Sequence, residues 1–427
     1  MADEPKVRFQ APRGTSDVLP EDEPYWSFAR ETGRRVARLF GYGLIETPMF
    51  EDAGIWIRTG QGTEIVEKEM YLFEDRGGDQ LALRPETTAS VCRAYIEHGM
   101  ATLTQPVRLY YFAQKFRYDR PQAGRYRQHS EFGIEAIGEA DAAVDAEVID
   151  LLTTFYQALG LSGLSLHLNS IGDAACRPAY VELLRAYYKE HLSSVCPDCS
   201  APGGRYEKNP LRLLDCKQPQ CQPIIAKAPT IAEHLCASCA DHFGKLRSYL
   251  DALGIAYELD PRLVRGLDYY TRTVFEFMPP EEGAQSTVGA GGRYDGLIEL
   301  LGGKPTPGIG FGSGIERIII NLKRQNIAVP PVEGPRVYVA HTSEATQAAA
   351  LRLAHRLRDG GVNAVAGSGG RSLKSQLRHA GALGARYAAI LGEQELAKGE
   401  VTLRDLSNGE QRSVGEGDVV GAVTLVA

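Results

Sequence analysis

The order of apolar and polar positions along the 427-residue chain predicts helices and strands in proportions that change along its length. Residues 24–40 repeat apolar side chains at helical spacing, and the YGLIETPMFE run after them is typical of a strand that ends at Pro48. Residues 176–258 favour helices. Residues 262–325 return to strands and glycine-rich turns and close with a helix in GIERIIINLKRQN. The pattern predicts a strand-containing body that a mainly helical segment interrupts.

A proline-rich run, IAVPPVEGP, separates this body from the C-terminal part of the chain. After the run, short segments alternate strand and helix as βαβ units do: RVYVAHT, ALRLAHRLRDGG, VNAVAG, SLKSQLRHAGALG, YAAILG and EVTLRDL. A chain of this length exceeds a single core, so two or three domains are expected. The expected boundaries are 1–325 for a first domain with an insertion at about 176–258, 326–334 for a linker, and 335–427 for an α/β domain.

A hairpin rich in charge is predicted where VRLYYFAQKFRYD and the alternating HSEFGIEAIG flank a loop marked by Pro121 and Gly124. The arginines around this loop are Arg117, Arg120, Arg125 and Arg127. A solvated loop is the commoner origin of such a charge run. Here the alternation predicts that both strands present arginines and carboxylates from one face. Such a surface suits a ligand that carries both anions and cations.

The run GIGFGSGIERI places Gly308, Gly310, Gly312 and Gly314 at alternate positions. On a strand these glycines would share one face and leave a flat, bare surface for a planar ring. The run is not a G-x-G-x-x-G motif, and the chain has no G-x-x-x-x-G-K-[ST], so neither a Rossmann fold nor a P-loop is indicated. A tightly packed strand–helix junction would also explain the glycines. It would not explain Arg317, which begins the next helix and is well placed for a phosphate or a base.

The distribution of charge distinguishes the C-terminal part from the rest of the chain. The whole chain carries 47 − 54 = −7, and this charge argues against wholesale non-specific binding of nucleic acid. Between Arg336 and Arg386 the sequence has eight cations and two anions, Glu344 and Asp359, so the net charge of this stretch is +6. The rest of the chain, from Tyr387 onward, has a net charge of −4. Arg371, Lys374 and Arg378 fall at helical spacing within this basic stretch, opposite a face made by Leu373, Leu377 and Ala380. A solvated outer helix is one explanation, and a polyanion-binding face is the one that the asymmetry favours.

Seven of the eight cysteines fall in the helical segment. Cys196 and Cys199 form one C-x-x-C motif and Cys236 and Cys239 another, and paired motifs of this kind often hold structural zinc. However, 36 residues separate the two pairs, more than the 15–20 of a compact zinc ribbon. Zinc and ordinary reduced thiols both stay open, and no metal ligand is assigned. The N-terminus lacks an apolar signal core, and no stretch approaches 18 uncharged apolar residues, so we expect a cytoplasmic protein without membrane contact.

Five separate segments together resemble the histidyl-tRNA synthetases, a family of class II aminoacyl-tRNA synthetases. They are LRPETT, FRYDRPQAGRYRQ, LVRGLDYYTRTVFEF, GGRYDGL and GIGFGSGIERI. The resemblance covers essentially the whole chain. It implies an α+β catalytic core with an antiparallel sheet, a mainly helical insertion and a C-terminal α/β anticodon-binding domain. It also implies a homodimer whose interface includes the first helix and the strand that ends at Pro48.

The resemblance implies that the chain joins L-histidine to tRNA(His) through a histidyl-adenylate, with ATP as substrate and Mg²⁺ on the phosphates. It assigns catalysis to Arg265 and Arg117. The implied histidine-binding residues are Glu86, Thr87, Thr88, Glu131, Glu135, Tyr269 and Tyr270. The implied ATP-binding residues are Arg117, Arg125, Arg265 and Arg317. The tRNA is expected at the hairpin loop, with Arg120, Arg125 and Arg127, and at the basic helix face of Arg371, Lys374 and Arg378.

Two positions depart from the family pattern. Glu131 stands where many relatives have an amide, and Asp119 stands where a glutamate is frequent. The carboxylate of Glu131 would suit the substrate ammonium but would add negative charge near ATP. Two other functions stay open from the sequence, namely a non-catalytic paralogue that regulates histidine biosynthesis and a tRNA-binding module without catalysis.

Overall fold

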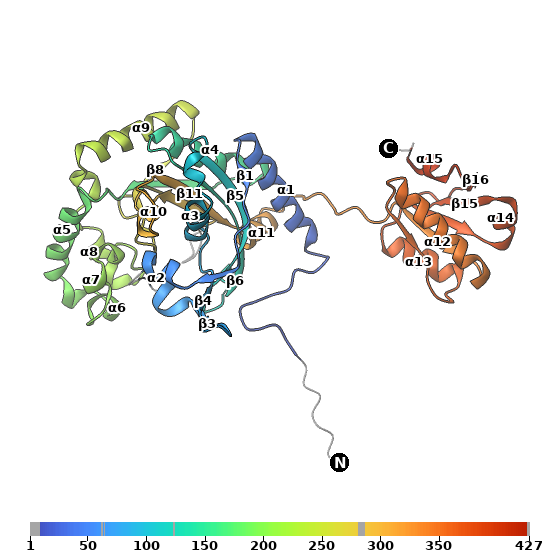
Figure 1. Ribbon diagram of the computed structural model, residues 1–427, viewed down its shortest axis with the longest axis horizontal. Coiled ribbons are helices and arrows are strands. Elements are labelled where there is room, and N and C mark those ends of the chain that lie inside the picture. The colour runs from blue at the N-terminus through green and yellow to red at the C-terminus, as the bar shows by residue number, and fades with distance from the viewer. Residues whose placement is uncertain (1–8, 61–62, 64, 123, 281–286, 425–427) are drawn as a thin grey trace, which may run out of the picture. The chain divides into compact units, whose positions relative to one another are not determined.

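The computed structural model describes residues 9–60, 63, 65–122, 124–280 and 287–424. The chain forms two compact units, Met1–Val329 and Pro330–Ala427 (Figure 1). The boundary between them along the chain falls inside the stretch expected to be a linker. Among the described helices, none combines the length and the apolar composition needed to span a bilayer.

The N-terminal unit is built on an eight-stranded sheet in the order β1-β5-β6-β11-β10-β9-β7-β8. In this order the strands are Gly43–Leu44, Val107–Phe116, Gln128–Ile137, Gly308–Gly314, Gly289–Arg293, Thr271–Met278, Ser165–Ser170 and Glu258–Leu259. The outer pairs β1/β5 and β7/β8 are parallel, and the other described pairs are antiparallel. The predicted antiparallel core and the predicted hairpin β5–β6 are confirmed.

Helices cover one face of this sheet (Figure 1). They are α1 (Glu23–Leu39), α4 (Ala142–Ala158), α9 (Ala237–Leu253) and α11 (Ile315–Arg324). Because side chains alternate along a strand, Tyr110, Phe132 and Phe311 enter the core beneath these helices while their neighbours face the opposite side. That opposite side carries the candidate site.

Smaller elements border the site. A three-stranded sheet has the order β2 (Phe50–Asp52), β4 (Gln80–Leu83), β3 (Tyr71–Glu74). Short helices accompany it, namely α2 (Gly54–Gly60), α3 (Thr88–Glu97) and α10 (Leu297–Leu300). The strand predicted to end at Pro48 is much shorter than expected. Only Gly43–Leu44 of that run pairs with β5, and the next strand starts after the proline, at Phe50, because Pro48 cannot donate to a ladder.

The interrupting segment is mainly helical, as predicted, and lies at one end of the unit, green to yellow-green in Figure 1. Its helices before α9 are α5 (Arg177–Lys189), α6 (Pro197–Ser200), α7 (Arg205–Lys208) and α8 (Gln222–Ile225), joined by 3₁₀ turns such as Pro210–Leu213. The segment has its own small core, in which Tyr180, Leu184 and Leu213 pack with buried cysteines.

A buried polar cluster joins four elements of the N-terminal unit. Arg293 on β10 forms an ion pair with Asp145 on α4, and both side chains are fully buried. His242 on α9 and the hydroxyl of Thr273 on β9 also contact the Asp145 carboxylate, at 2.9 and 2.6 Å. Arg293 therefore contributes to the core of the fold, since its donors point away from the candidate site.

The C-terminal unit is a five-stranded sheet in the order β13-β12-β14-β15-β16. The strands β12 to β16 are Val337–His341, Ala364–Ala366, Tyr387–Leu391, Glu400–Asp405 and Gln411–Gly415. The helices α12 to α15 are Glu344–Asp359, Leu373–Ala382, Glu393–Lys398 and Val419–Thr424. The first three strands are parallel, as βαβ units require, whereas β15 and β16 return antiparallel. The predicted α/β domain is confirmed.

Candidate active site

The glycine strand β11 makes room for two buried carboxylates. Gly310 lies opposite Glu135 on β6, and a side chain at this position would overlap Oε2 of Glu135. A side chain at Gly312 would overlap the carboxylate of Glu131 in the same way. The prediction of a bare surface for a planar ring is therefore wrong at these two positions, because the space that the glycines leave is filled from the neighbouring strand.

Glu135 is a fully buried acid at the centre of the site. Its Oε1 accepts a hydrogen bond from the Tyr111 hydroxyl at 3.1 Å and its Oε2 one from Tyr294 at 2.5 Å. Burial, together with the nearby carboxylate of Glu86, raises the pKa of Glu135 to about 8 against the hydrogen bonds that lower it. The residue can therefore exist in either protonation state near neutral pH.

This raised pKa predicts that Glu135→Gln stabilises the fold more at pH 9 than at pH 5. Between about pH 4.5 and pH 8 the folded chain keeps a proton that the unfolded chain loses, so the wild-type stability falls as the pH rises. Glutamine does not titrate, and its advantage in melting temperature should grow across that range. Thermal unfolding of both proteins at both pH values checks this, with Glu190→Gln at an exposed helix end as the control. An equal difference at both pH values would contradict the raised pKa.

Glu86 forms the second acidic wall of the site. It accepts from Trp56 Nε1 at 3.0 Å, from the backbone N–H of Ala89 at 3.1 Å and from the Tyr269 hydroxyl at 3.3 Å. Burial raises the pKa of Glu86, and the cations of Lys115 and Arg117 partly offset the shift. Tyr269 thus holds Glu86 as well as lining the pocket.

Two hydroxyls at the start of α3 have no hydrogen-bond partner within the described part of the chain. Thr87 precedes the helix, Ser90 lies in its first turn, and the Oγ atoms of both are buried. Thr88 lies between them, and its hydroxyl contacts Glu135. Buried polar groups are normally satisfied, so unpaired hydroxyls beside two acids point to a polar ligand.

Lys115 is a site residue that the sequence did not reveal. Its ammonium is buried on β5 and forms an ion pair with Glu131 on β6. Burial lowers the pKa of Lys115, although the Glu131 carboxylate opposes the shift. The negative charge that Glu131 was expected to add near ATP therefore has a partner on the neighbouring strand. A lysine on the same face as Tyr111 and Ala113, inside an otherwise aromatic and aliphatic strand, was the available signal.

The four arginines of the hairpin lie in the loop between the strands. β5 ends at Phe116 and β6 begins at Gln128, so the prediction that the strands themselves present arginines is wrong. Arg117 donates from Nε to the Pro85 carbonyl at 2.8 Å, whereas Arg120 is exposed.

The two remaining loop arginines are held by Asp119. Arg125 forms an ion pair with its carboxylate, and Arg127 donates from Nε to its carbonyl at 3.1 Å. The guanidinium of Arg127 also stacks 3.8 Å from the ring centroid of Tyr118. Asp119 therefore organises the loop from within.

Arg317, in the first turn of α11, adds a further cation to the region of the loop arginines. It donates from Nε to the Gly124 carbonyl at 2.9 Å and from Nη1 to the Thr287 carbonyl at 2.5 Å. Burial lowers the pKa of Arg317, and the nearby cations of Arg125, Arg117 and Arg265 lower it further. Cations repel one another, so the group is suited to an anion that would neutralise it.

Arg265 lies in the loop before β9 and shares a cavity of about 390 Å³ with Arg117, Tyr270 and Glu276. Its guanidinium forms an ion pair with Glu276 and lies 5.9 Å from the Tyr270 ring centroid, while its Nε is buried without a partner in the described structure. Burial raises the pKa of Tyr270 to about 12, so this hydroxyl stays protonated. Glu276 is a second site residue that the sequence did not reveal, although it lies within the quoted run TRTVFEF.

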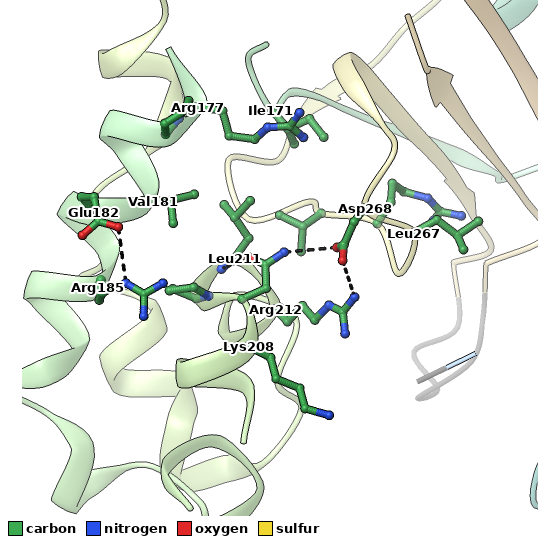
Figure 2. Close-up of a pocket in the computed structure, with 15 residues that line it drawn as sticks. Ile171, Arg177, Val181, Glu182, Arg185, Lys208, Leu211, Arg212, Leu267 and Asp268 are labelled. Carbon is green, nitrogen blue, oxygen red and sulfur yellow. Dashed lines mark hydrogen bonds and ion pairs between the residues drawn. The ribbon is translucent and has the colours of Figure 1, made fainter. Parts of the chain in front are cut away.

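The insertion borders this cavity and holds the Arg265 loop. Figure 2 shows a second cavity, of about 440 Å³, between α5, the segment 208–212 and the loop 264–268. Asp268 accepts from Asn209 Nδ2 at 3.1 Å and from Arg212 Nη2 at 2.7 Å. These contacts fix the loop from the side of the insertion.

In the C-terminal unit, α13 has the two faces that the sequence predicts. Ala380 is buried and Leu373 and Leu377 pack against the same core, whereas Lys374 and Arg378 are exposed. Arg371 is exposed just before the helix. Within the described residues no ion pair involves these three cations, so they form an uncompensated basic surface of this unit.

The two C-x-x-C motifs do not face one another. Cys196 and Cys199 meet Cys216 and Cys221, whereas Cys236 and Cys239 meet Cys176 and Asp173. A single site built from both motifs is therefore wrong, because each motif closes against a different part of the chain.

Comparisons with known proteins agree on one family. Residues 14–177 and 215–318 match a family model described as "Histidyl-tRNA synthetase", and residues 336–424 match one described as "Anticodon binding domain". A histidine–tRNA ligase from Dehalococcoides mccartyi is 56% identical over 407 residues, which cover 95% of this chain and 97% of that protein. One from Desulforamulus reducens is 50% identical over 404 residues, covering 94% and 96%. The crystal structure of apo S. aureus histidyl-tRNA synthetase matches this chain with a TM-score of 0.82 at 35% sequence identity. The match covers 97% of this chain and 100% of that chain.

Proposed function

The chain belongs to the histidyl-tRNA synthetase family, and from this premise we propose how its site carries out the reaction. It is an aminoacyl-tRNA ligase that joins histidine to tRNA at the expense of ATP. The observation that carries the proposal is the meeting of buried acids (Glu86, Glu131, Glu135) with arginines from three separate segments (Arg117, Arg265, Arg317). An amino acid needs the acids for its cationic groups, and ATP needs the arginines for its phosphates.

In the first step the histidine carboxylate attacks the α-phosphorus of ATP. A carboxylate-oxygen–phosphorus bond forms, the bond to the bridging oxygen breaks, and pyrophosphate leaves with the electron pair. Arg117 and Arg265 bind the α-phosphate, where charge develops, and Arg317 reaches toward the γ-phosphate with Arg125 beside it. Such transfers depend on positioning and charge neutralisation more than on covalent help from the protein.

Glu276 and the phosphates of ATP would together hold Mg²⁺, which supplies further charge neutralisation when bound. A carboxylate in the cavity of Arg117 and Arg265 fits this ion, since magnesium in nucleotide sites takes one or two carboxylates besides phosphate oxygens. In the first step described above, the phosphates are bound by the chain's own arginines.

Histidine is recognised at both of its ends. Glu86 and the hydroxyls of Thr87 and Thr88 receive the ammonium, and Glu131 lies near them. At the imidazole, the Tyr270 hydroxyl donates to one ring nitrogen and Glu135 accepts from the other, since a neutral imidazole offers one donor and one acceptor. Tyr269 lines the pocket and holds Glu86.

In the second step the terminal ribose hydroxyl of tRNA(His) attacks the carbonyl of the adenylate. An ester bond forms, the hydroxyl proton passes to the leaving phosphate, and AMP leaves with the electrons of the broken bond between the carbonyl carbon and the phosphate oxygen. Arg120, Arg125 and Arg127 contact the acceptor end from the hairpin loop, and the basic face of α13 contacts the anticodon arm. We place this reaction in the cytoplasm, where charged tRNA is used.

Histidine-dependent exchange of pyrophosphate into ATP tests the proposal. We expect exchange with histidine and none with the other amino acids, because it reports adenylate formation directly. A regulatory paralogue would show no exchange, and a tRNA-binding module would bind tRNA without any response to histidine or ATP. The match of residues 336–424 to an anticodon-binding domain supports the ligase over the regulatory paralogue, which by family resemblance lacks that domain.

A homodimer is the expected assembly, with an interface over the apolar surface near β1 to β3. α1 packs one face inside its own unit, so its other face and the exposed residues on the strands after it are free to carry the contact. Leu44, Phe50 and Leu72 are 52%, 54% and 53% exposed. Such an apolar surface suits a two-fold interface.

Sedimentation velocity at micromolar concentration tests the dimer. The double variant Phe50→Asp, Leu72→Asp should sediment as a monomer, because each carboxylate would be buried without a partner. Leu253→Asp on α9, where the side chain is 52% exposed, should remain a dimer. A wild-type monomer with full activity would contradict the assembly.

The double variant Lys374→Ala, Arg378→Ala should bind tRNA more weakly and with a shallower salt dependence. Each lost phosphate contact makes the slope of log K against log salt shallower by about one unit. Filter binding across a salt series measures the slope, and pyrophosphate exchange should stay normal. Lys398→Ala, Arg412→Ala removes the same charge from the acidic half of the domain and serves as the control. Equal slopes in both variants would assign tRNA binding to another surface.

A further inference from the structure

Two clusters of metal-ligating side chains lie outside the site described above. Each contains four residues whose ligand atoms lie within 4.8 Å of one another. The first comprises Cys196, Cys199, Cys216 and Cys221, and the second comprises Asp173, Cys176, Cys236 and Cys239. We propose that each cluster binds one structural Zn²⁺ ion, so that the insertion is a metal-stabilised module.

The four-cysteine cluster has the geometry that tetrahedral zinc requires. Zinc–sulfur bonds of about 2.3 Å place tetrahedral sulfur atoms roughly 3.8 Å apart, and the Sγ atoms of Cys196 and Cys216 are 3.7 Å apart. A disulfide would need about 2.05 Å. The backbone N–H of Cys196 donates to Sγ of Cys221 at 3.2 Å, an outer-shell contact that favours a thiolate.

The spacing along the chain also fits once the correct partners are known. Cys196 and Cys199 form a C-x₂-C pair, and Cys216 and Cys221 form a C-x₄-C pair. Between the pairs lie 216 − 199 − 1 = 16 residues, within the 15–20 that are typical of zinc ribbons. The family model leaves residues 178–214 unmatched, so the first pair lies outside the part that it describes.

Reduced thiols in a hydrophobic core are the alternative, since free cysteine packs as a small apolar side chain. The surroundings argue against it. The three helices around the cluster, α6, α7 and α8, have four residues each. Although Tyr180, Leu184 and Tyr188 of α5 pack beside the cysteines, elements this short bury little apolar surface of their own, and small modules of this kind usually depend on a metal or on disulfides. All eight cysteines are free of disulfides in the described structure.

The second cluster joins the two ends of the insertion. Asp173 and Cys176 lie at the start of α5, and Cys236 and Cys239 lie at the start of α9. The Sγ atoms of Cys176 and Cys239 are 3.8 Å apart, again the tetrahedral separation. Three thiolates and a carboxylate form a donor set that zinc accepts.

Arg272 on β9 prepares the carboxylate of this second cluster. Its Nη2 donates to Oδ2 of Asp173 at 3.2 Å, while Oδ1 points toward the sulfur atoms of Cys176 and Cys236 at 3.7 and 4.0 Å. One oxygen is thereby fixed from outside and the other is directed to the metal, as is usual for an outer-shell partner. The zinc therefore ties both ends of the insertion to strand β9 of the catalytic sheet.

Metal analysis of the full-length chain tests the proposal directly. Protein prepared under reducing conditions without chelator should contain two zinc ions per chain by plasma mass spectrometry, one for each cluster. Cys216→Ser, Cys221→Ser should lose one ion, and Cys236→Ser, Cys239→Ser should lose the other. Cys92→Ser, a buried cysteine on α3 outside both clusters, should keep both ions. Growth in Co²⁺ should give the intense visible absorption of tetrahedral cobalt thiolate.

Zinc content near zero in the unmodified chain would overturn both sites, and this result does not depend on whether any variant folds. Two ions retained in one of these double variants would overturn the cluster that carries the substitutions and leave the other cluster standing. Mercurial titration of the thiols, followed with a zinc indicator, should release the metal in step with thiol modification. Loss of the zinc should also abolish pyrophosphate exchange until Zn²⁺, but not Mg²⁺, is restored. That last result rests on the proposed function, whereas the metal count does not.

Discussion

Replacing Arg265 with alanine is expected to slow histidine-dependent pyrophosphate exchange by about 10²- to 10³-fold, the usual cost of removing one group that stabilises developing charge. Arg265 shares its cavity with Arg117, and its charge would meet the α-phosphate as the carboxylate attacks. Binding of tRNA should change little, because the contacts expected for the tRNA lie on other segments. The measurement is the exchange rate at saturating ATP and histidine, with tRNA affinity measured on the same protein.

A loss of activity in Arg265→Ala has a second possible origin, because the variant leaves Glu276 without its ion-pair partner. The kinetic constants separate the two. If the unpaired carboxylate repels ATP, the KM for ATP rises; if Arg265 neutralises charge that develops during the attack, kcat falls even at saturating ATP. Arg108→Ala breaks an ion pair between Arg108 Nε and Glu147 Oε1, which are 2.9 Å apart. These two side chains are 30% and 28% exposed and lie outside the cavity, so this variant should retain activity. Exchange near the wild-type rate in Arg265→Ala would remove this residue from the mechanism.

Tyr270→Phe and Glu135→Gln should impair the use of histidine by as much as about 10⁴-fold in kcat/KM while changing the KM for ATP little. A pocket that recognises a polar side chain by hydrogen bonds discriminates strongly, since a buried group left unpaired is costly. Tyr270 stays protonated and can donate, because burial raises its pKa to about 12. Exchange kinetics over a range of histidine and ATP concentrations give both constants.

Tyr95→Phe is the matched control for these variants. It removes a buried hydroxyl that bonds Gln105 at 3.3 Å, away from the acids of the pocket. Its histidine kinetics should stay within a few-fold of the wild type. Unchanged kcat and KM for histidine in both Tyr270→Phe and Glu135→Gln would show that other residues read the imidazole.

Much of the fold was predictable from the sequence because it depends on local alternation. The apolar and polar alternation of β6 places Phe132 and Ile134 beneath the helices, and this pattern needs no knowledge of neighbouring strands. The two faces of α13 followed for the same reason. The short strand around Leu44 did not, because its length depends on how far an edge strand can pair before Pro48.

The site was predictable only where one segment carries its own signal. The ion pair of Lys115 with Glu131 depends on which strands are neighbours and in which register, and that of Arg265 with Glu276 depends on how the loop before β9 folds against the strand. Such information is absent from spacing along the chain. The cysteines failed in the same way: Cys196 and Cys199 look like partners of the other C-x-x-C motif until the fold brings Cys216 to them.

The fit between Gly312 and Glu131 restricts how this pocket could evolve. A methyl group at position 312 would occupy the space of the Glu131 carboxylate, so any side chain there requires the end of Glu131 to move. A shorter side chain at Glu131 would open the space, but it would also leave the ammonium of Lys115 without its ion-pair partner. The three positions are thus coupled, and a change at position 312 in a relative should be accompanied by changes at positions 131 and 115.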